Sequence, residues 1–143
     1  MAKIAVIYWS GTGNTEAMAQ LVAEGAGVAG DEVVLSNVSD ISVDEALACD
    51  KVALGCPAMG AEELEDGEFQ PFYDEFKAGF GSKPLVLFGS YNWADGEWMA
   101  TWQNDAKDAG LNLVAEGLIC YDGPEDGDKV EDCKQLGETL AKA

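Results

Sequence analysis

The sequence predicts an α/β protein in which one parallel β-sheet carries helices on both faces. Short apolar runs rich in β-branched residues alternate along the chain with longer segments whose apolar residues recur at helical spacing. Parallel strands need crossover connections, which helices usually provide, so this alternation favours a doubly wound parallel sheet. The 143 residues contain no internal repeat and no linker-like stretch, and this length suits one domain spanning residues 1–143.

Three strands and one helix are predicted in the first part of the chain. Lys3–Tyr8 is a short β-branched and aromatic run, which is typical of a strand buried on both faces. Thr15–Ala29 has its apolar residues at helical spacing and predicts the first helix. Glu32–Leu35 and Lys51–Cys56 predict the second and third strands, and between them we expect one helical turn near Val43–Leu47.

An acidic loop and an aromatic helix are predicted next. The loop covers Met59–Glu68, and its acidic residues gather at the end nearer the helix. Phe69–Phe80 predicts a helix, because its aromatic residues fall on one helical stripe and Pro71 sits in the first turn, where proline is tolerated. Leu85–Tyr91 is again apolar and predicts the fourth strand.

The last part of the chain repeats the alternation. Gly96–Ala109 predicts a helix that ends at Gly110. Asn112–Tyr121 predicts the fifth strand, with a break or a bulge at Gly117. Val130–Ala141 predicts the last helix. The chain thus offers five strands and four clear helices in alternation.

The charge of the chain excludes several classes of partner. The sequence has 27 Asp and Glu residues against 8 Lys and Arg, which gives a formal net charge of −19 at pH 7. Nucleic acids and anionic membranes attract clustered cations, so neither is an expected partner. Proteins with basic surface patches are expected partners, because opposite fields steer their encounter. The absence of His also excludes Ser–His and Cys–His catalysis and His-ligated metal sites.

The cysteines and the hydropathy pattern indicate a cytoplasmic protein. The four cysteines, at positions 49, 56, 120 and 133, include no CxxC pair, so we expect no zinc or iron–sulfur site. Free buried thiols are typical of a reducing compartment. The chain has no apolar stretch of about 18 residues and no signal-like start, so we expect neither a transmembrane helix nor export.

Ligands of such sheets bind beyond the carboxyl ends of the strands, which points to the loops Trp9–Asn14, Pro57–Glu68 and Gly89–Gly96. The first loop contains the string SGTGNT, whose glycines and hydroxyls favour a phosphate held by backbone N–H groups at a helix start. It is not a Walker A motif, which needs Lys where Asn14 stands, nor a dinucleotide fingerprint, because Glu16 replaces the third Gly. An ordinary strand–helix turn with Thr or Asn caps is the alternative.

The second and third loops bring a thioether and an aromatic side chain to the predicted ligand edge. Met59 and Trp93 can clasp a flat ring, with packing of each loop against a helix as the alternative. Trp98 and Trp102 lie on a predicted helix, and for them we expect core packing. The acidic run Glu62–Glu68 either steers a basic partner or is a solvated loop, and we prefer steering.

Three strings of the sequence together resemble the flavodoxin family. YWSGTGNTE at Tyr8–Glu16 resembles the family's phosphate loop, and GCPAMGAEELED at Gly55–Asp66 and FGSYNW at Phe88–Trp93 resemble its two ring-binding loops. They occur in the family's order and spacing, without the long insertion in the fifth strand, so the chain is similar to the short-chain flavodoxins of anaerobic bacteria. The resemblance implies a flavodoxin-like doubly wound five-stranded parallel sheet of order 2-1-3-4-5 with helices on both faces.

The resemblance also implies a bound FMN and assigns its contacts by position. Met59 would cover the inner face of the flavin ring, Trp93 would cover its outer face, and Glu62 would accept a hydrogen bond from ring N3–H. The Gly60 carbonyl would turn, by a flip of the Gly60–Ala61 peptide, toward flavin N5 once N5 carries a proton. The implied cofactor-binding residues are Ser10, Gly11, Thr12, Gly13, Asn14 and Thr15 from the phosphate loop, and Pro57, Ala58, Met59, Gly60, Ala61, Glu62, Gly89, Ser90, Tyr91 and Trp93 from the two ring-binding loops.

The function that the resemblance implies is electron transfer rather than enzyme catalysis. The protein would be a low-potential one-electron carrier whose non-covalently bound FMN shuttles between semiquinone and hydroquinone. It would work as a diffusing monomer with redox partner proteins that carry basic surface patches. An NAD(P)H-dependent reductase on the same fold and a flavin-free binding module are the alternatives, which NAD(P)H oxidation and a colourless protein, respectively, would indicate.

Two positions depart from the family pattern. Ala61 stands at the third position of the Met59–Glu62 turn, where Asp, Asn or Gly is more usual. A type II turn needs a positive φ at that position, so we expect Ala61 to favour the flipped form of the turn. The run Tyr121–Gly123 replaces an expected neutral residue near the flavin, so no FMN contact is assigned there.

Overall fold

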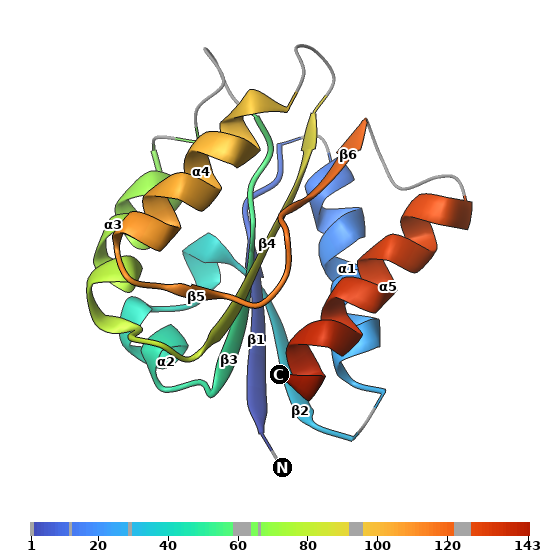
Figure 1. Ribbon diagram of the computed structural model, residues 1–143, viewed down its shortest axis with the longest axis horizontal. Coiled ribbons are helices and arrows are strands. Elements are labelled where there is room, and N and C mark those ends of the chain that lie inside the picture. The colour runs from blue at the N-terminus through green and yellow to red at the C-terminus, as the bar shows by residue number, and fades with distance from the viewer. Residues whose placement is uncertain are drawn as a thin grey trace.

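A central parallel sheet lies between two layers of helices (Figure 1). The computed structural model describes residues 2–11, 13–28, 30–58, 64–65, 67–91, 96–121 and 127–143. The strands are β1 Lys3–Tyr8, β2 Glu32–Asn37, β3 Lys51–Gly55, β4 Pro84–Tyr91, β5 Asn112–Leu113 and β6 Leu118–Tyr121. The helices are α1 Asn14–Ala26, α2 Val43–Leu47, α3 Phe69–Gly79, α4 Glu97–Asp108 and α5 Gly127–Lys142, with a 3-10 turn at Val38–Asp40.

The strand order is β2-β1-β3-β4-β5, and the pairs between the described strands are parallel. The predicted α/β fold and the order 2-1-3-4-5 are therefore confirmed. The chain adds β2 on one side of β1 and then returns to add β3 on the other side. The strand order thus reverses at β1, where loops leave the sheet toward opposite faces and leave room for a ligand at the carboxyl edge.

The predicted fifth strand is split into two short strands on the same edge of β4. β5 pairs with β4 at Pro84 and Leu85, and β6 pairs with β4 from Phe88 to Tyr91. The break includes Gly117, as predicted, because this residue packs against helix α4. Its N–H donates to Gln103 Oε1 at 2.9 Å, and a Cβ at position 117 would lie 2.5 Å from Met99 Sδ.

Some helix boundaries differ from the predicted ones. α1 ends at Ala26 rather than at Ala29, and the N–H of the capping residue Gly27 bonds to two carbonyls of the last turn. α5 begins at Gly127 rather than at Val130. The turn at Val38–Asp40 is absent from the sequence prediction, and it forms where the Asn37 side chain accepts the Ser39 N–H at 3.0 Å.

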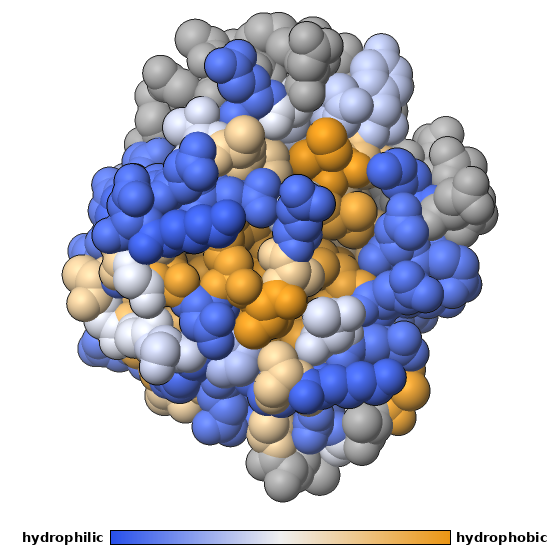
Figure 2. Space-filling view, in the orientation of Figure 1, coloured by the Kyte–Doolittle hydropathy of each residue, from blue (hydrophilic) through white to orange (hydrophobic). Residues whose placement is uncertain are grey.

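Each face of the sheet has its own hydrophobic core. The face toward α3 and α4 is filled mainly by aromatic side chains, and the face toward α1 and α5 mainly by aliphatic ones. The predicted inward stripe of α3 is confirmed, since Phe69, Phe72, Tyr73 and Phe76 are all buried. Figure 2 shows hydrophilic residues over the helices on the viewed face, with apolar residues gathered between α4 and α5 where β5 and β6 lie.

Helices α1 and α5 approach each other through a pair of glycines. A Cβ at Gly25 of α1 would overlap the Lys134 carbonyl of α5, and a Cβ at Gly137 of α5 would overlap the Val22 carbonyl of α1. The two helix backbones are therefore in direct contact at this crossing. Any side chain there has to push the helices apart, which disturbs the core beneath them.

We expect Gly137→Ala to destabilise the protein by about 2 kcal/mol, the usual size of an overpacking effect. Ala is the better helix former by about 1 kcal/mol, which acts in the opposite direction, so a net loss of stability means that the overlap outweighs this gain. Urea unfolding measures the change. Gly27→Ala is the matched control, because a Cβ there meets its nearest atom at an ordinary 3.5 Å. Equal stability of Gly137→Ala and the wild-type chain would contradict this account of the crossing.

A polar cluster joins α3 to α4 at the edge of the aromatic core. Tyr73 Oη donates to Asp105 Oδ2 at 2.8 Å, and Lys77 Nζ donates to the same oxygen at 2.9 Å. Partial burial by itself would raise the pKa of Asp105. The hydrogen bonds from Lys77 and Tyr73 lower the pKa by more than burial raises it, so the pKa lies below its usual value. The ionised form of Asp105 therefore stabilises the contact between the two helices.

We expect Asp105→Asn to lower the free energy of unfolding at pH 7 by about 1 kcal/mol, a modest figure because the carboxylate is partly solvated. The pKa of Asp105 is lower in the folded state than in the unfolded state. The stability that the Asp105 carboxylate contributes is therefore complete above the unfolded-state pKa of about 3.9, and it is lost as the pH falls through the folded-state pKa. Urea unfolding between about pH 7 and pH 3 should show the two proteins converging. Asp108→Asn, on the exposed end of the same helix, is the control. A difference in unfolding free energy between Asp105→Asn and the wild-type chain that stays constant with pH would contradict the stabilising role of the ionised Asp105.

Candidate functional site

The three predicted loops begin at adjacent strand ends on the carboxyl edge of the sheet. Backbone hydrogen bonds continue the ladder just beyond the strands: Trp9 N–H donates to Gly55 O at 3.0 Å, Cys56 N–H to Phe88 O at 3.1 Å, and Ala58 N–H to Ser90 O at 3.1 Å. The starts of the loops after β1, β3 and β4 are therefore held side by side. This is the edge at which ligands of doubly wound sheets bind.

The loop after β1 turns tightly into helix α1. Ser10 Oγ accepts the Gly13 N–H at 3.0 Å, and Gly13 has a φ of 93°, a conformation that favours glycine. The first i to i−4 bond of the helix runs from Ala17 N–H to Gly13 O at 3.0 Å. The N–H groups of Asn14 to Glu16 therefore have no acceptor within the helix and lie at its positive end. This arrangement suits an anion.

Two buried hydroxyl groups connect this helix start to the end of β4. Thr15 Oγ1 and Ser90 Oγ lie 2.8 Å apart, and the two residues are only 1% and 4% exposed. Each hydroxyl carries one proton, and their mutual bond uses one of the two. Neither hydroxyl bonds to another side chain or backbone group among the described residues, so the other proton is available to a further acceptor at the same place. The sequence assigns both residues to the cofactor, and the fold brings them into contact across 75 positions of sequence.

Gly89 has a packing role that the sequence does not reveal. A Cβ at this position would overlap the Cys56 carbonyl of the neighbouring strand end. Trp98 Nε1 donates to that same carbonyl at 3.2 Å. Trp98 and Trp102 are each 2% exposed, so their predicted core packing is confirmed.

The remaining described candidates lie at or near the surface of this edge. Gly11 and Gly13 are exposed, whereas Ser10, Asn14, Pro57, Ala58 and Tyr91 are half-buried. The Tyr91 ring contacts Trp98 at a centroid distance of 5.7 Å and Tyr121 at 5.5 Å, and Tyr121 itself is exposed. The other predicted site residues lie outside the described residues, and their roles stay predictions: Thr12, Met59, Gly60, Ala61, Glu62 and Trp93.

The acidic loop is less uniformly solvated than its composition suggests. Glu65 accepts three backbone N–H groups at the start of α3. Partial burial by itself would raise the pKa of Glu65. The three backbone hydrogen bonds lower the pKa by more than burial raises it, so the pKa lies below its usual value. Glu68 accepts the Trp9 Nε1–H at 3.4 Å. Sequence reasoning missed both contacts, although an acidic residue shortly before a predicted helix is a capping signal for Glu65.

One further carboxylate contact joins the first strand to the first helix. Tyr8 Oη donates to Glu16 Oε2 at 2.9 Å. Burial raises the pKa of Tyr8, and the bond to Glu16 raises it further, so the phenol stays protonated near neutral pH. The contact ties the end of β1 to the first turn of α1, on either side of the predicted phosphate loop.

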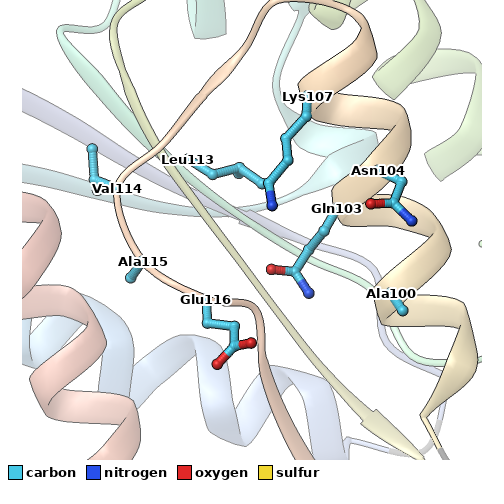
Figure 3. Close-up of a pocket in the computed structure, with 8 residues that line it drawn as sticks. All are labelled: Ala100, Gln103, Asn104, Lys107, Leu113, Val114, Ala115 and Glu116. Atoms are coloured by element: carbon cyan, nitrogen blue, oxygen red, sulfur yellow. The ribbon is translucent and has the colours of Figure 1, made fainter.

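The described part of the chain also contains cavities away from this edge. One of them is a groove of about 420 Å³ between α4 and the segment Leu113–Glu116. Figure 3 shows Gln103 and Lys107 extending from α4 toward this segment. None of the predicted cofactor-binding residues lines this groove. Among the described residues, no group of three Cys, Asp or Glu is placed to hold a metal ion. No helix in the described ranges is both long and apolar enough to cross a membrane.

Comparisons with known proteins agree with the fold and with the order of the loops. A family model described as Flavodoxin matches residues 6–135. Flavodoxin from Megasphaera elsdenii is 41% identical over 140 residues, covering 98% of this chain and 99% of that protein. Flavodoxin from Clostridium beijerinckii is 43% identical over 136 residues, covering 95% and 97%.

A solved structure matches the fold directly. The solution structure of two-electron reduced Megasphaera elsdenii flavodoxin has a TM-score of 0.86 and 40% sequence identity, covering 98% of this chain and 99% of that one. The matched family region spans all three loops of the carboxyl edge. With its sheet order, its loops and relatives of matching length, the chain belongs to the flavodoxin family.

Proposed function

We propose that this chain is a low-potential one-electron carrier that binds FMN non-covalently and shuttles it between semiquinone and hydroquinone. Family membership supports a flavin-binding electron-transfer protein rather than an enzyme. The observation in this chain that carries the proposal is the buried pair of hydroxyls, Thr15 and Ser90, near the N–H groups of the α1 start that have no acceptor within the helix. A buried hydroxyl proton without an acceptor is costly, and a phosphate oxygen supplies one.

The residues of the first loop fit a phosphate monoester without any cation. Ser10, Thr12, Asn14 and Thr15 would hold it through side chains and backbone N–H groups, and the loop contains no Lys or Arg. The fixed N–H groups and the dipole of α1 supply the positive potential instead. This neutral site leaves the phosphate charge uncompensated, which matters for the potential of the flavin.

The ring would lie between the second and third loops. Met59 would cover its inner face, Trp93 its outer face, and Glu62 would accept a hydrogen bond from N3–H, while the peptides of Gly89 to Tyr91 would border its pyrimidine end. FMN, when bound, supplies the one-electron chemistry. The Gly60 carbonyl would accept a hydrogen bond from N5–H after a flip of the Gly60–Ala61 peptide, and a bond made in only one redox state shifts that couple.

The charge of the protein would hold the second reduction step at low potential. A more negative ring would lie near an uncompensated phosphate and inside a chain of formal charge −19, which would disfavour the added charge. The same charge would steer redox partners with basic surface patches, and the exposed Glu97 lies at the start of α4 beside this edge. All four cysteines are buried, and Cys49, Cys56 and Cys133 are free thiols, which supports work in a reducing cytoplasm. We also propose a monomer.

An anaerobic reductive titration of the purified protein tests this function. We expect a yellow protein with one FMN per chain that is reduced in two separate one-electron steps, the second at strongly negative potential. NAD(P)H alone should not reduce it. Reduction in one two-electron step, or turnover of NAD(P)H, would contradict the carrier and favour a reductase. A colourless protein that takes up no added FMN would contradict flavin binding itself.

We expect Thr15→Val to weaken FMN binding by at least tenfold, because a hydrogen bond to a charged group is worth about 1.5–3 kcal/mol. Fluorescence titration of the apoprotein with FMN measures the affinity, and riboflavin, which has no phosphate, should bind both proteins equally. Thr139→Val, the same change at an exposed position of α5, should bind FMN as the wild-type chain does. An unchanged affinity in Thr15→Val would remove the hydroxyl pair from the phosphate site.

A further inference from the structure

One bond of the ladder between β3 and β4 is missing at the carboxyl edge of the sheet. The Cys56 N–H donates to Phe88 O at 3.1 Å. Further along, the Ala58 N–H donates to Ser90 O at 3.1 Å. In a regular parallel ladder the bonds are evenly spaced, and one from the Ser90 N–H to the Cys56 carbonyl lies between these two. That bond does not form, although the bonds on both sides of it do.

The Cys56 carbonyl accepts a hydrogen bond from a side chain instead of the ladder bond. Trp98 Nε1 of helix α4 donates to it at 3.2 Å, and Trp98 is 2% exposed. A Cβ at Gly89 would overlap this carbonyl oxygen and would lie 3.0 Å from Trp98 Cζ2. The oxygen therefore lies where a side chain at position 89 would start, on the face of the sheet toward α4. Because position 89 is a glycine, the carbonyl can leave the ladder and meet the indole.

Ser90 is left with an unpaired backbone donor at the candidate site. The N–H and C=O of one strand residue point toward the same neighbouring strand, so the Ser90 N–H faces β3 as its carbonyl does. Among the described residues, no group accepts this N–H. Ser90 is only 4% exposed, and a buried N–H without an acceptor costs free energy. The Ser90 hydroxyl lies 2.8 Å from Thr15 Oγ1, so both donors of Ser90 belong to the predicted ligand edge.

We propose that Trp98 is a positioning residue for FMN, a role that deepens the proposed function and rests on it. By holding the Cys56 carbonyl out of the ladder, the Trp98 indole keeps the Ser90 N–H available to an oxygen of the cofactor. Trp98 acts through the Cys56 carbonyl, which is the acceptor that the ladder would otherwise give this N–H. Gly89 provides the space in which the carbonyl turns toward the indole.

Replacing the indole by a phenyl ring reverses this arrangement. The Cys56 carbonyl, in a residue that is 0% exposed, then loses its side-chain donor, and the Ser90 N–H is the donor that a regular ladder provides for it. FMN must then compete with a bond inside the protein for the same N–H. A net hydrogen bond of ordinary strength corresponds to a change in affinity of about fivefold.

The experiment compares Trp98→Phe with the matched control Trp102→Phe. Trp102 lies on the same helix and is also 2% exposed, but its Nε1 has no hydrogen-bond partner among the described residues. Both variants lose the same atoms from the aromatic core, and only the first loses a bond to the strand end. Fluorescence titration of the apoproteins measures the affinities for FMN and for riboflavin. Hydrogen exchange followed by NMR measures the protection of the Ser90 amide, and urea unfolding measures stability.

We expect Trp98→Phe to bind FMN about fivefold more weakly than the wild-type chain. In its apoprotein the Ser90 amide should exchange at least about tenfold more slowly, because the Cys56 carbonyl now accepts it, whereas a loss of stability alone would speed exchange. Trp102→Phe should keep the wild-type FMN affinity and Ser90 exchange while losing stability. An equal loss of riboflavin affinity in Trp98→Phe would place the acceptor on the flavin or ribityl part, and a loss for FMN alone would place it on the phosphate.

The wild-type chain provides a second test that does not depend on a variant. FMN binding should slow exchange of the Ser90 amide by a larger factor than exchange of the Cys56 amide. The Cys56 N–H already donates to Phe88 O without the cofactor, so the added protection of Ser90 reports the new bond rather than the general stabilisation by a ligand.

Three outcomes would overturn the role of Trp98. They are wild-type FMN affinity or wild-type Ser90 exchange in Trp98→Phe, equal shifts of both quantities in Trp102→Phe, and a wild-type complex in which FMN protects the Ser90 amide no more than the Cys56 amide. The last decides even if Trp98→Phe does not fold. A wild-type chain that binds no FMN overturns the proposed function instead, while Ser90 exchange in the apoproteins still tests what Trp98 does to the ladder.

Discussion

The carboxyl edge of the sheet depends on backbone hydrogen bonds that continue past the ends of β1, β3 and β4. Trp9, Cys56 and Ala58 each donate an N–H to the neighbouring strand end. These bonds hold three loops from distant parts of the chain at one place. The start of α1 and the hydroxyl groups of Thr15 and Ser90 lie where these bonds place the strand ends. Because parallel strands end at a common edge, one regular ladder positions the described starts of all three loops.

Close backbone packing at glycines holds together the strands and helices that carry this edge. Gly89 lets the ends of β3 and β4 approach until no Cβ fits between Gly89 and the Cys56 carbonyl. Gly25 and Gly137 do the same for α1 and α5, the helix pair behind the predicted phosphate loop. Close packing of this kind resists small displacements, because shifting one backbone requires shifting its neighbour. The hydroxyl pair of Thr15 and Ser90 is therefore held at a fixed separation rather than assembled by a ligand.

Much of the fold was predictable because each element carries a local signal. Strand β1 and helix α3 lie where the apolar run Lys3–Tyr8 and the aromatic stripe from Phe69 predicted them. In both cases the apolar side chains indicate which face is buried in the core. The split of the fifth strand at Gly117 was also readable, because a glycine inside a strand pattern marks a close approach. The turn after Asn37 could not be predicted from hydrophobic periodicity, because it is stabilised by a hydrogen bond from the Ser39 N–H to the Asn37 side chain.

By itself the sequence determined the class of fold, the three loops and the family, because periodicity, turn residues and ordered motifs are properties of neighbouring residues. Only the tertiary structure decided which side chains meet. Thr15 and Ser90 form one buried pair, Glu65 bonds to Cys56 and to the start of α3, and Glu68 reaches Trp9. The Thr15–Ser90 and Trp9–Glu68 contacts join residues 75 and 59 positions apart along the chain, and their energies depend on distances that exist only after the sheet has brought its strand ends together.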